Sequence, residues 1–177
     1  EYADHLGPHY GRLAHHHVHA GDAMLASRYL VLAGDRDHAS YANLEAREAY
    51  KAALVWHDRC VDPLYPRDTI LLRLAKVERD LGELDSALVH LDTHDALTTS
   101  SLAAWDLRGN ILIRKGQLAE ARAAYEHMLT LSREDCWTVA KAHTGLANVA
   151  RRQGDTAQAI ALAEQAMPEL LAVGDYE

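Results

Sequence analysis

The sequence of 177 residues contains no phenylalanine, only four prolines, ten glycines and two cysteines. Few prolines and glycines leave few points at which a helix must end. Cys60 and Cys136 are too few and too far apart for a disulfide framework or a cysteine-based zinc site, so we expect a reducing, cytoplasmic setting. The apolar runs are far shorter than the roughly 20 residues that a membrane span needs, and no membrane partner is expected.

Alanine and leucine are abundant instead, with 31 and 26 copies. Both are strong helix formers, and this balance predicts an all-α protein. The charged residues comprise 18 Lys and Arg against 26 Asp and Glu, for a net charge of −8. A surface of that sign repels a phosphate backbone, so nucleic acid is not an expected partner.

An internal repeat becomes visible when the glycines are aligned. Gly116 has Trp105 at −11, Gly109 at −7, Ala121 at +5 and Tyr125 at +9. Other glycines share this register, at spacings of 34 and 38 residues or near the start: Gly82 with Ala87 and Leu91, Gly154 with Ala159 and Ala163, and Gly21 with Ala26 and Leu30. Such a pattern predicts helix pairs, in which the glycine ends the first helix, the alanine lies where the axes cross and the +9 residue fills the gap.

The register predicts about four to five helix pairs in one solenoid over 1–177. It comprises divergent repeats in 1–56, a connector with two prolines in 57–67 and three more regular repeats in 68–177. No glycine precedes Ala46 by five residues, so we expect only a short first helix there, near 37–41. The predicted helices are 9–20, 22–33, 36–56 with a break near Asn43, 68–81, 84–94, 101–115, 118–131, 134–153 and 156–172.

The Trp105, Gly109, Gly116, Ala121 and Tyr125 set resembles the tetratricopeptide repeat (TPR) superfamily. The resemblance implies a right-handed α–α superhelix that binds other proteins. Residues 10–54 also resemble the junction that follows the ATPase module in large bacterial signalling proteins, such as adenylate or guanylate cyclase-linked predicted ATPases and LuxR- or MalT-type regulators. This second resemblance implies a regulatory segment of a larger protein whose ATPase or cyclase domains lie elsewhere.

In TPR proteins the first helix of each pair lines the inner groove. By that resemblance the groove positions are rich in cations and amides, namely Arg73, Lys76, Asn110, Arg114, Lys141, Asn148 and Arg151. This set partly resembles the TPR modules that clamp a carboxylate, and it predicts a groove for an acidic peptide. An alternative is that arginines in last helical turns, such as Arg114 and Arg151, only offset the helix dipole.

The sequence contains no phosphate-binding loop, nucleophile elbow or metalloprotease motif, so we expect neither catalysis nor a cofactor. His15 and His19 have the i, i+4 spacing of a metal-binding pair, but they lack the further ligands that zinc prefers, so no metal site is predicted. The leading interpretation is a non-catalytic interaction or regulatory scaffold. Two alternatives are a small-molecule-sensing domain and a self-association module, the latter forming a homodimer through an uncapped end at 174–177.

Overall fold

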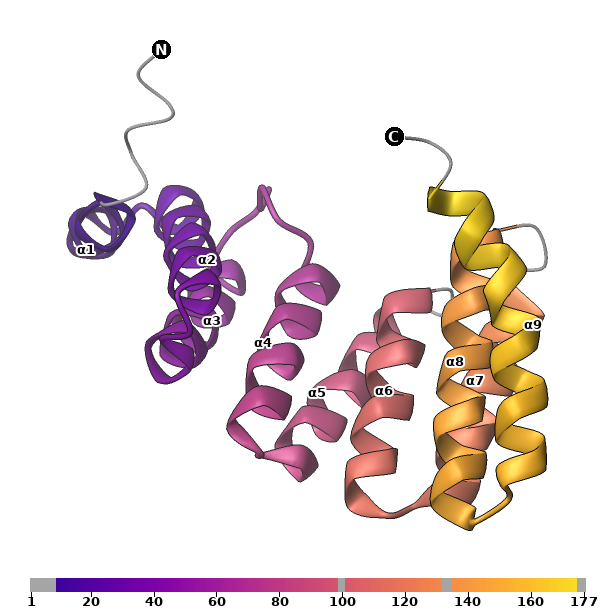
Figure 1. The fold of residues 1–177 in the computed structure, drawn as a ribbon. Helices are drawn as coiled ribbons and strands as arrows, with labels where there is room; N and C mark the ends of the chain where they lie inside the picture. Colours follow the sequence, from indigo (N-terminus) through magenta and orange to yellow (C-terminus); the bar gives the residue numbers. More distant parts are fainter. Residues whose placement is uncertain (1–8, 99–100, 132–134, 175–177) are drawn as a thin grey trace. The chain divides into compact units, whose positions relative to one another are not determined.

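The computed structural model describes residues 9–98, 101–131 and 135–174. These residues contain nine α-helices and no strand, which confirms the predicted all-α class (Figure 1). The helices are α1 Tyr10–Ala20, α2 Ala23–Ala39, α3 Asn43–His57, α4 Arg67–Leu81, α5 Leu84–Leu97, α6 Leu102–Lys115, α7 Leu118–Leu131, α8 Cys136–Gln153 and α9 Thr156–Gly174. Among them no helix is both long enough and apolar enough to cross a bilayer.

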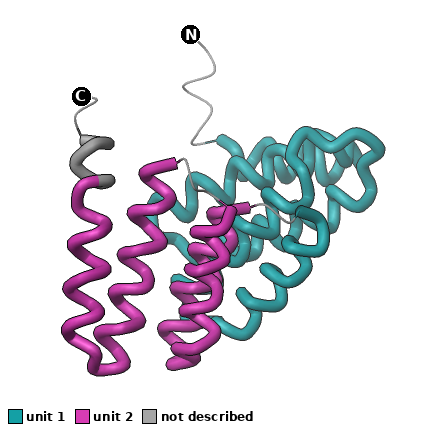
Figure 2. Tube along the Cα trace, turned by 90° about the vertical axis from the view of Figure 1, so that its right-hand side faces the viewer, with its two compact units in different colours: residues 1–98 teal, residues 99–177 magenta. Residues whose placement is uncertain are grey.

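The chain divides into two compact units, residues 1–98 with α1 to α5 and residues 99–177 with α6 to α9 (Figure 2). In each unit consecutive helices pack on one another, and in the second unit α6 also contacts α8. A first helix that contacts the next first helix is the arrangement that gives a helical repeat protein its lined inner face.

Left-handed glycines end four of the helices. Gly21, Gly82, Gly116 and Gly154 have φ between 72° and 83° and follow α1, α4, α6 and α8. Glycine adopts this conformation without the steric penalty of a Cβ atom, and its N–H then bonds to a carbonyl of the last turn.

The small residues at +5 are the alanines expected where the helix axes cross, and most of them are buried. Ala26, Ala87 and Ala121 are completely buried, whereas Ala159 on α9 is half-buried. Of the larger signature residues, Tyr125 is 1% exposed, and Leu30 and Trp105 are half-buried. The Trp105 ring lies 4.3 Å from the ring of His127, measured between centroids.

The second and third helices differ from the sequence prediction. The helix expected to end at 33 continues as α2 to Ala39, and no short helix forms over 37–41. Gly34 does not end a helix, because it lies inside α2, where an added methyl group would lie 2.7 Å from Tyr50 Cε1. The chain reverses at Tyr41 instead, which has φ 62° and is the one described non-glycine residue with positive φ.

Tyr41 therefore occupies the turn position that glycine occupies elsewhere. Counting from it, Gly34 is at −7, Ala46 at +5 and Tyr50 at +9, as in the pair around Gly116. In this register α2 is the first helix of a pair with α3, with a turn residue that is not glycine, and it is also the helix that follows Gly21. Together with α4 this pair forms a core cluster of the first unit, which contains the buried residues Val31, Ala46, Tyr50, Ala53, Ile70, Leu74 and Val77.

A polar contact joins α2 to α4 on the outside of this core. His38 Nε2 lies 2.9 Å from Asp80 Oδ2, and Arg79 donates from Nε to the other oxygen of Asp80 at 2.9 Å. Partial burial alone would raise the pKa of the Asp80 carboxyl, but the hydrogen bonds from His38 and Arg79 outweigh it and lower that pKa.

One aromatic ring holds three helices of the second unit together. Tyr125 on α7 lies against Gly109 of α6, where an added methyl group would be 2.5 Å from the ring Cζ, and equally closely against Gly145 of α8. A glycine at −7 accompanies a tyrosine at +9 in both the α2–α3 and α6–α7 pairs. Where −7 is alanine, as at Ala75 and Ala147, the +9 residue is the smaller Leu91 or Ala163. A tyrosine at +9 therefore goes with a glycine at −7, because its ring occupies the space that a Cβ atom would take.

Candidate functional site

The structure distributes the seven predicted groove residues over three helices. Arg73 and Lys76 lie on α4 in the first unit, and the other five lie on α6 and α8 in the second. Asn110, Lys141 and Asn148 are brought together, because they line one hollow of about 330 Å³ in the second unit. The other lining residues are Asp106, Tyr125, Trp137, Thr144 and Gly145.

The polar groups of this hollow contact one another and are still accessible to a ligand. The side-chain amide nitrogen of Asn110 donates to the Asp106 carbonyl at 2.9 Å and to its Oδ1 at 3.0 Å. Lys141 Nζ lies 3.7 Å from Asp106 Oδ2 and 5.4 Å from the centroid of the Trp137 ring. The Lys141 side chain is 43% exposed, and an ion pair this exposed contributes roughly 0–1 kcal/mol. A ligand carboxylate can therefore take over the ammonium at little cost.

Tyr125 forms the floor of the hollow. Its burial, together with the nearby charge of Asp106, raises the pKa of the phenol above its ordinary value of 10. The hydroxyl therefore stays protonated at neutral pH, and the floor carries no negative charge of its own.

Trp137 is the residue that sequence reasoning missed. It is 46% exposed and stands in the first turn of α8 at the edge of the hollow. The signal was present, because the groove positions at −13, −10 and −6 from Gly154 extend by one turn to −17, which is Trp137. The groove face reaches Trp137 because α8 is longer than α6, with 18 residues against 14. Exposed tryptophans are frequent anchors of protein interfaces.

The remaining predicted cations lie outside this hollow. Arg73 Nε lies 3.3 Å from Asp35 Oδ1, the carboxylate that also accepts from the Tyr50 hydroxyl at 2.6 Å, and its guanidinium stacks over Tyr65 at 5.1 Å. Lys76 is half-buried on the same helix. Arg114 is in the last turn of α6, where a cation offsets the helix dipole. Arg73 thus has a structural role inside the first unit.

Arg151 belongs to the last turn of α8 and is exposed. Its Nη2 donates to Asn148 Oδ1 at 3.4 Å, and it forms no ion pair with a carboxylate in the described part of the chain. Arg151 lines a second hollow, between α8 and α9, that shares Thr144 and Asn148 with the first.

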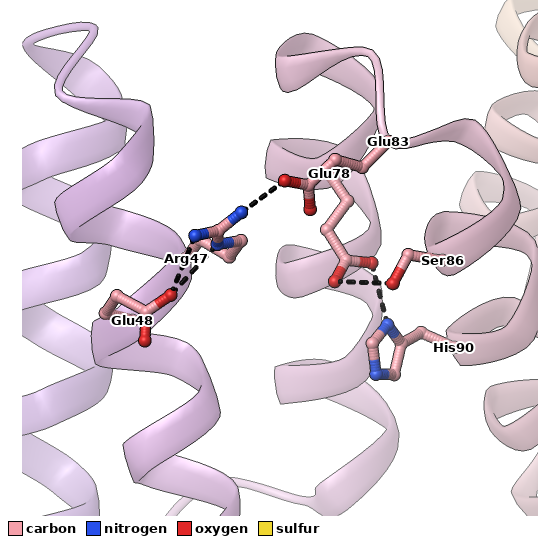
Figure 3. Close-up of polar contacts among 6 residues, drawn as sticks. All are labelled: Arg47, Glu48, Glu78, Glu83, Ser86 and His90. Atoms are coloured by element: carbon pink, nitrogen blue, oxygen red, sulfur yellow. Dashed lines mark hydrogen bonds and ion pairs between the residues drawn. The ribbon is translucent and has the colours of Figure 1, made fainter.

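A buried carboxylate in the first unit is the other chemically notable group (Figure 3). Glu78 on α4 is fully buried. Its Oε1 accepts a hydrogen bond from Ser86 Oγ at 3.3 Å, and its Oε2 lies 2.7 Å from His90 Nδ1 on α5. Ser86 and His90 thus each contact the carboxylate, one at each oxygen. The cluster is a polar link between two helices.

A second polar link joins α3 to the turn after α4. Arg47 on α3 contacts both Glu48, at 3.0 Å, and Glu83 (Figure 3). Its hydrogen bond to Glu48, followed by the charges of Glu83 and Glu48, raises the pKa of the Arg47 guanidinium. The guanidinium therefore remains charged, and this contact too is structural.

The histidine-rich first helix contains one close pair. The rings of His15 and His19 lie 4.2 Å apart, measured between centroids. In the part of the chain that the structure describes, no three His, Cys, Asp or Glu residues form a group that could hold a metal ion. Cys60 and Cys136 are free thiols.

Comparison with known proteins identifies the repeat. Residues 65–141 match the family described as tetratricopeptide repeat-like domain. No curated protein sequence matches the chain.

Solved structures resemble this fold at low sequence identity. MamA has a TM-score of 0.74 at 17% identity, with 98% of this chain and 91% of MamA covered. BtubC from P. vanneervenii has a TM-score of 0.73 at 18% identity, over 88% and 67% of the two chains. YrrB, a TPR protein with an unusual peptide-binding site, has a TM-score of 0.64 at 16% identity, over 90% and 84%. The predicted TPR-like solenoid fold is confirmed, and the match to the tetratricopeptide repeat-like family covers residues 65–141 within it.

Proposed function

We propose that this protein is a non-catalytic interaction scaffold whose second unit binds an acidic peptide segment of a partner protein. The observation that carries the proposal is the 330 Å³ hollow between α6 and α8, where an exposed tryptophan, a lysine and two asparagines converge. A peptide needs an apolar anchor and donors for its backbone and carboxylates, and this hollow offers both.

The preference for an acidic peptide rests on Lys141. The ammonium has only the exposed pairing with Asp106 and lies over the Trp137 ring, so a ligand carboxylate can approach it from the solvent side. Asn148, about two turns further along the same face of α8, supplies an amide for the peptide backbone. The fold similarity to YrrB, a TPR protein with a peptide-binding site, supports peptide binding as the kind of function.

The experiment is a peptide array of acidic, neutral and basic 15-residue sequences probed with the full chain, followed by titration of the best peptide. We expect acidic peptides to bind, and Lys141→Glu to weaken the best of them by at least about tenfold, since charge reversal replaces an attraction by a repulsion. The matched control is Lys51→Glu, an exposed charge reversal on α3 in the first unit. An array without preference for acidic sequences, or equal losses in the two variants, refutes the proposal.

We further propose that the scaffold is a cytoplasmic regulatory part of a larger bacterial signalling protein. The support is the resemblance of residues 10–54, which form α1, α2 and most of α3, to the junction in cyclase- and ATPase-linked regulators. The test is the complete reading frame: an ATPase or nucleotide cyclase domain in it supports this context, and a frame without such domains contradicts it.

A further inference from the structure

The hollow between α6 and α8 contains a carboxylate as well as a cation. Asp106 and Lys141 are the two charged residues among the described residues that line it, and Lys141 Nζ lies 3.7 Å from Asp106 Oδ2. The other oxygen of Asp106 accepts a hydrogen bond from the side-chain amide of Asn110 at 3.0 Å. A ligand that carries only carboxylates therefore attracts Lys141 but places a like charge beside Asp106, which weakens its binding.

A similar carboxylate in the first unit shows which group satisfies it. Asp35 on α2 lies beside Tyr50, the +9 tyrosine of its pair, and accepts from the tyrosine hydroxyl at 2.6 Å. The cation of Asp35 is Arg73 on α4, whose Nε lies 3.3 Å from Oδ1 and whose guanidinium lies over the ring of Tyr65. A guanidinium suits this place because its planar group can pair with a carboxylate and stack on an aromatic ring at the same time.

The second unit has a comparable aromatic residue but no arginine. Trp137 and Tyr65 both stand 17 residues before the glycine that follows their helix, whereas nine residues before it α4 has Arg73 and α8 has Gly145. Gly145 lines the hollow and has no side chain that could fill it. Lys141 stands one turn earlier in α8, and its ammonium is an exposed and more distant partner for the carboxylate than Arg73 is in the first unit.

We propose that the segment of the partner protein that binds in this hollow carries an arginine beside its acidic residue, so that the arginine pairs with Asp106 and the acidic side chain pairs with Lys141. The pattern rests on the proposed function and deepens it, because it specifies the charges of the same peptide. The exchange leaves each of the four charges with a partner of opposite sign. A purely acidic segment would instead take the lysine from Asp106 and shield this carboxylate from water, which is unfavourable.

The test starts from the best acidic peptide of the array described above. Arginine or citrulline replaces, in turn, each residue two positions away from an acidic one, because alternate residues of an extended peptide share a face. Citrulline has nearly the shape of arginine but no charge. Fluorescence anisotropy with the full chain should show that, at one of these positions, the arginine peptide binds at least about tenfold more tightly than the citrulline peptide.

Two variants show where the arginine binds. Asp106→Asn should bind the arginine and citrulline peptides equally. The matched control is Glu126→Gln, which removes an exposed carboxylate on α7 that does not line the hollow, and it should keep the wild-type difference. An Asp106→Asn variant that keeps the difference overturns the proposal, because the arginine then pairs elsewhere. The comparison of the two peptides on the wild-type chain needs no variant and decides by itself if Asp106→Asn does not fold.

The outcomes separate this proposal from the proposed function. If no acidic peptide binds, both are wrong. If an acidic peptide binds through Lys141 but arginine is nowhere better than citrulline, only the charge pattern is wrong. The same titration with the protein encoded by the complete reading frame distinguishes a partner from the protein's own chain. Loss of binding there would mean that a segment of the same polypeptide fills the hollow, and it would overturn the assignment to a partner protein.

Discussion

Gly109→Ala tests the packing that positions the hollow between α6 and α8. The added methyl group would lie 2.5 to 2.9 Å from three ring carbons of Tyr125, against about 3.5–4.0 Å for a comfortable carbon contact. The ring cannot withdraw, because Gly145 closes its other side and Tyr125 is 1% exposed. The substitution therefore forces helices α6 and α7 apart.

The magnitude follows from two opposing effects. Overpacking a tight core costs roughly 1–3 kcal/mol, and the confinement of the ring places this site near the upper end. Replacing glycine by alanine inside a helix returns about 0.8–1 kcal/mol of helix propensity. We therefore expect a net loss of about 2 kcal/mol, or about 4–8 °C in Tm for a chain of this length.

Urea unfolding followed by far-ultraviolet circular dichroism measures the loss, and Gly11→Ala is the matched control. Gly11 lies in α1, and an added methyl group there meets nothing within 4 Å, so that variant should gain up to about 1 kcal/mol. Combining Gly109→Ala with Tyr125→Leu recreates the Ala75 and Leu91 arrangement, and the two changes should be non-additive by about 1–2 kcal/mol. If Gly109→Ala is as stable as wild type, or the double variant is simply additive, the packing account is wrong.

Three further predictions concern the first unit. His90→Ala leaves the buried Glu78 carboxylate without its closest partner and should lower the unfolding free energy by about 3 kcal/mol in urea, whereas replacing both residues by leucine should recover most of it. Tyr41→Gly removes a left-handed non-glycine residue from an exposed turn and should raise Tm, since the strain relieved is roughly 1 kcal/mol. Because the pKa of Asp80 is lowered in the folded state, its contribution to stability is present above pH 3.8 and is lost as pH falls through the folded pKa. The difference in unfolding free energy between wild type and Asp80→Asn should therefore be largest near neutral pH and disappear in acid. A difference that does not change with pH would contradict this.

The predictable part of the fold was the part that obeys a simple backbone rule. A glycine that ends a helix has a local cause, and the pairs around Gly82, Gly116 and Gly154 could be located from it. The α2–α3 pair broke the rule because Tyr41 adopts the left-handed conformation, and the glycine that was visible, Gly34, serves close packing instead. A glycine in this sequence can either end a helix or make room for a tyrosine ring. Only the position of the ring in the structure distinguishes the two roles.

For the candidate site, the sequence could predict which residues share a face of a helix but not which contacts they make. The resemblance to TPR proteins predicted Asn110, Lys141 and Asn148 as residues of one groove, and in the structure they line one hollow. Two ion pairs could not be predicted, Lys141 with Asp106 and Arg73 with Asp35. They depend on distances between helices, which the residue pattern of one helix does not contain.

The ring of Tyr125 has a consequence for how the second unit comes apart. It is held by a glycine of its own pair and by a glycine of the next, so α8 cannot leave without exposing the ring, and α6 and α7 lose their filler once it is exposed. In amide hydrogen exchange, α6, α7 and α8 should therefore open as one cooperative block.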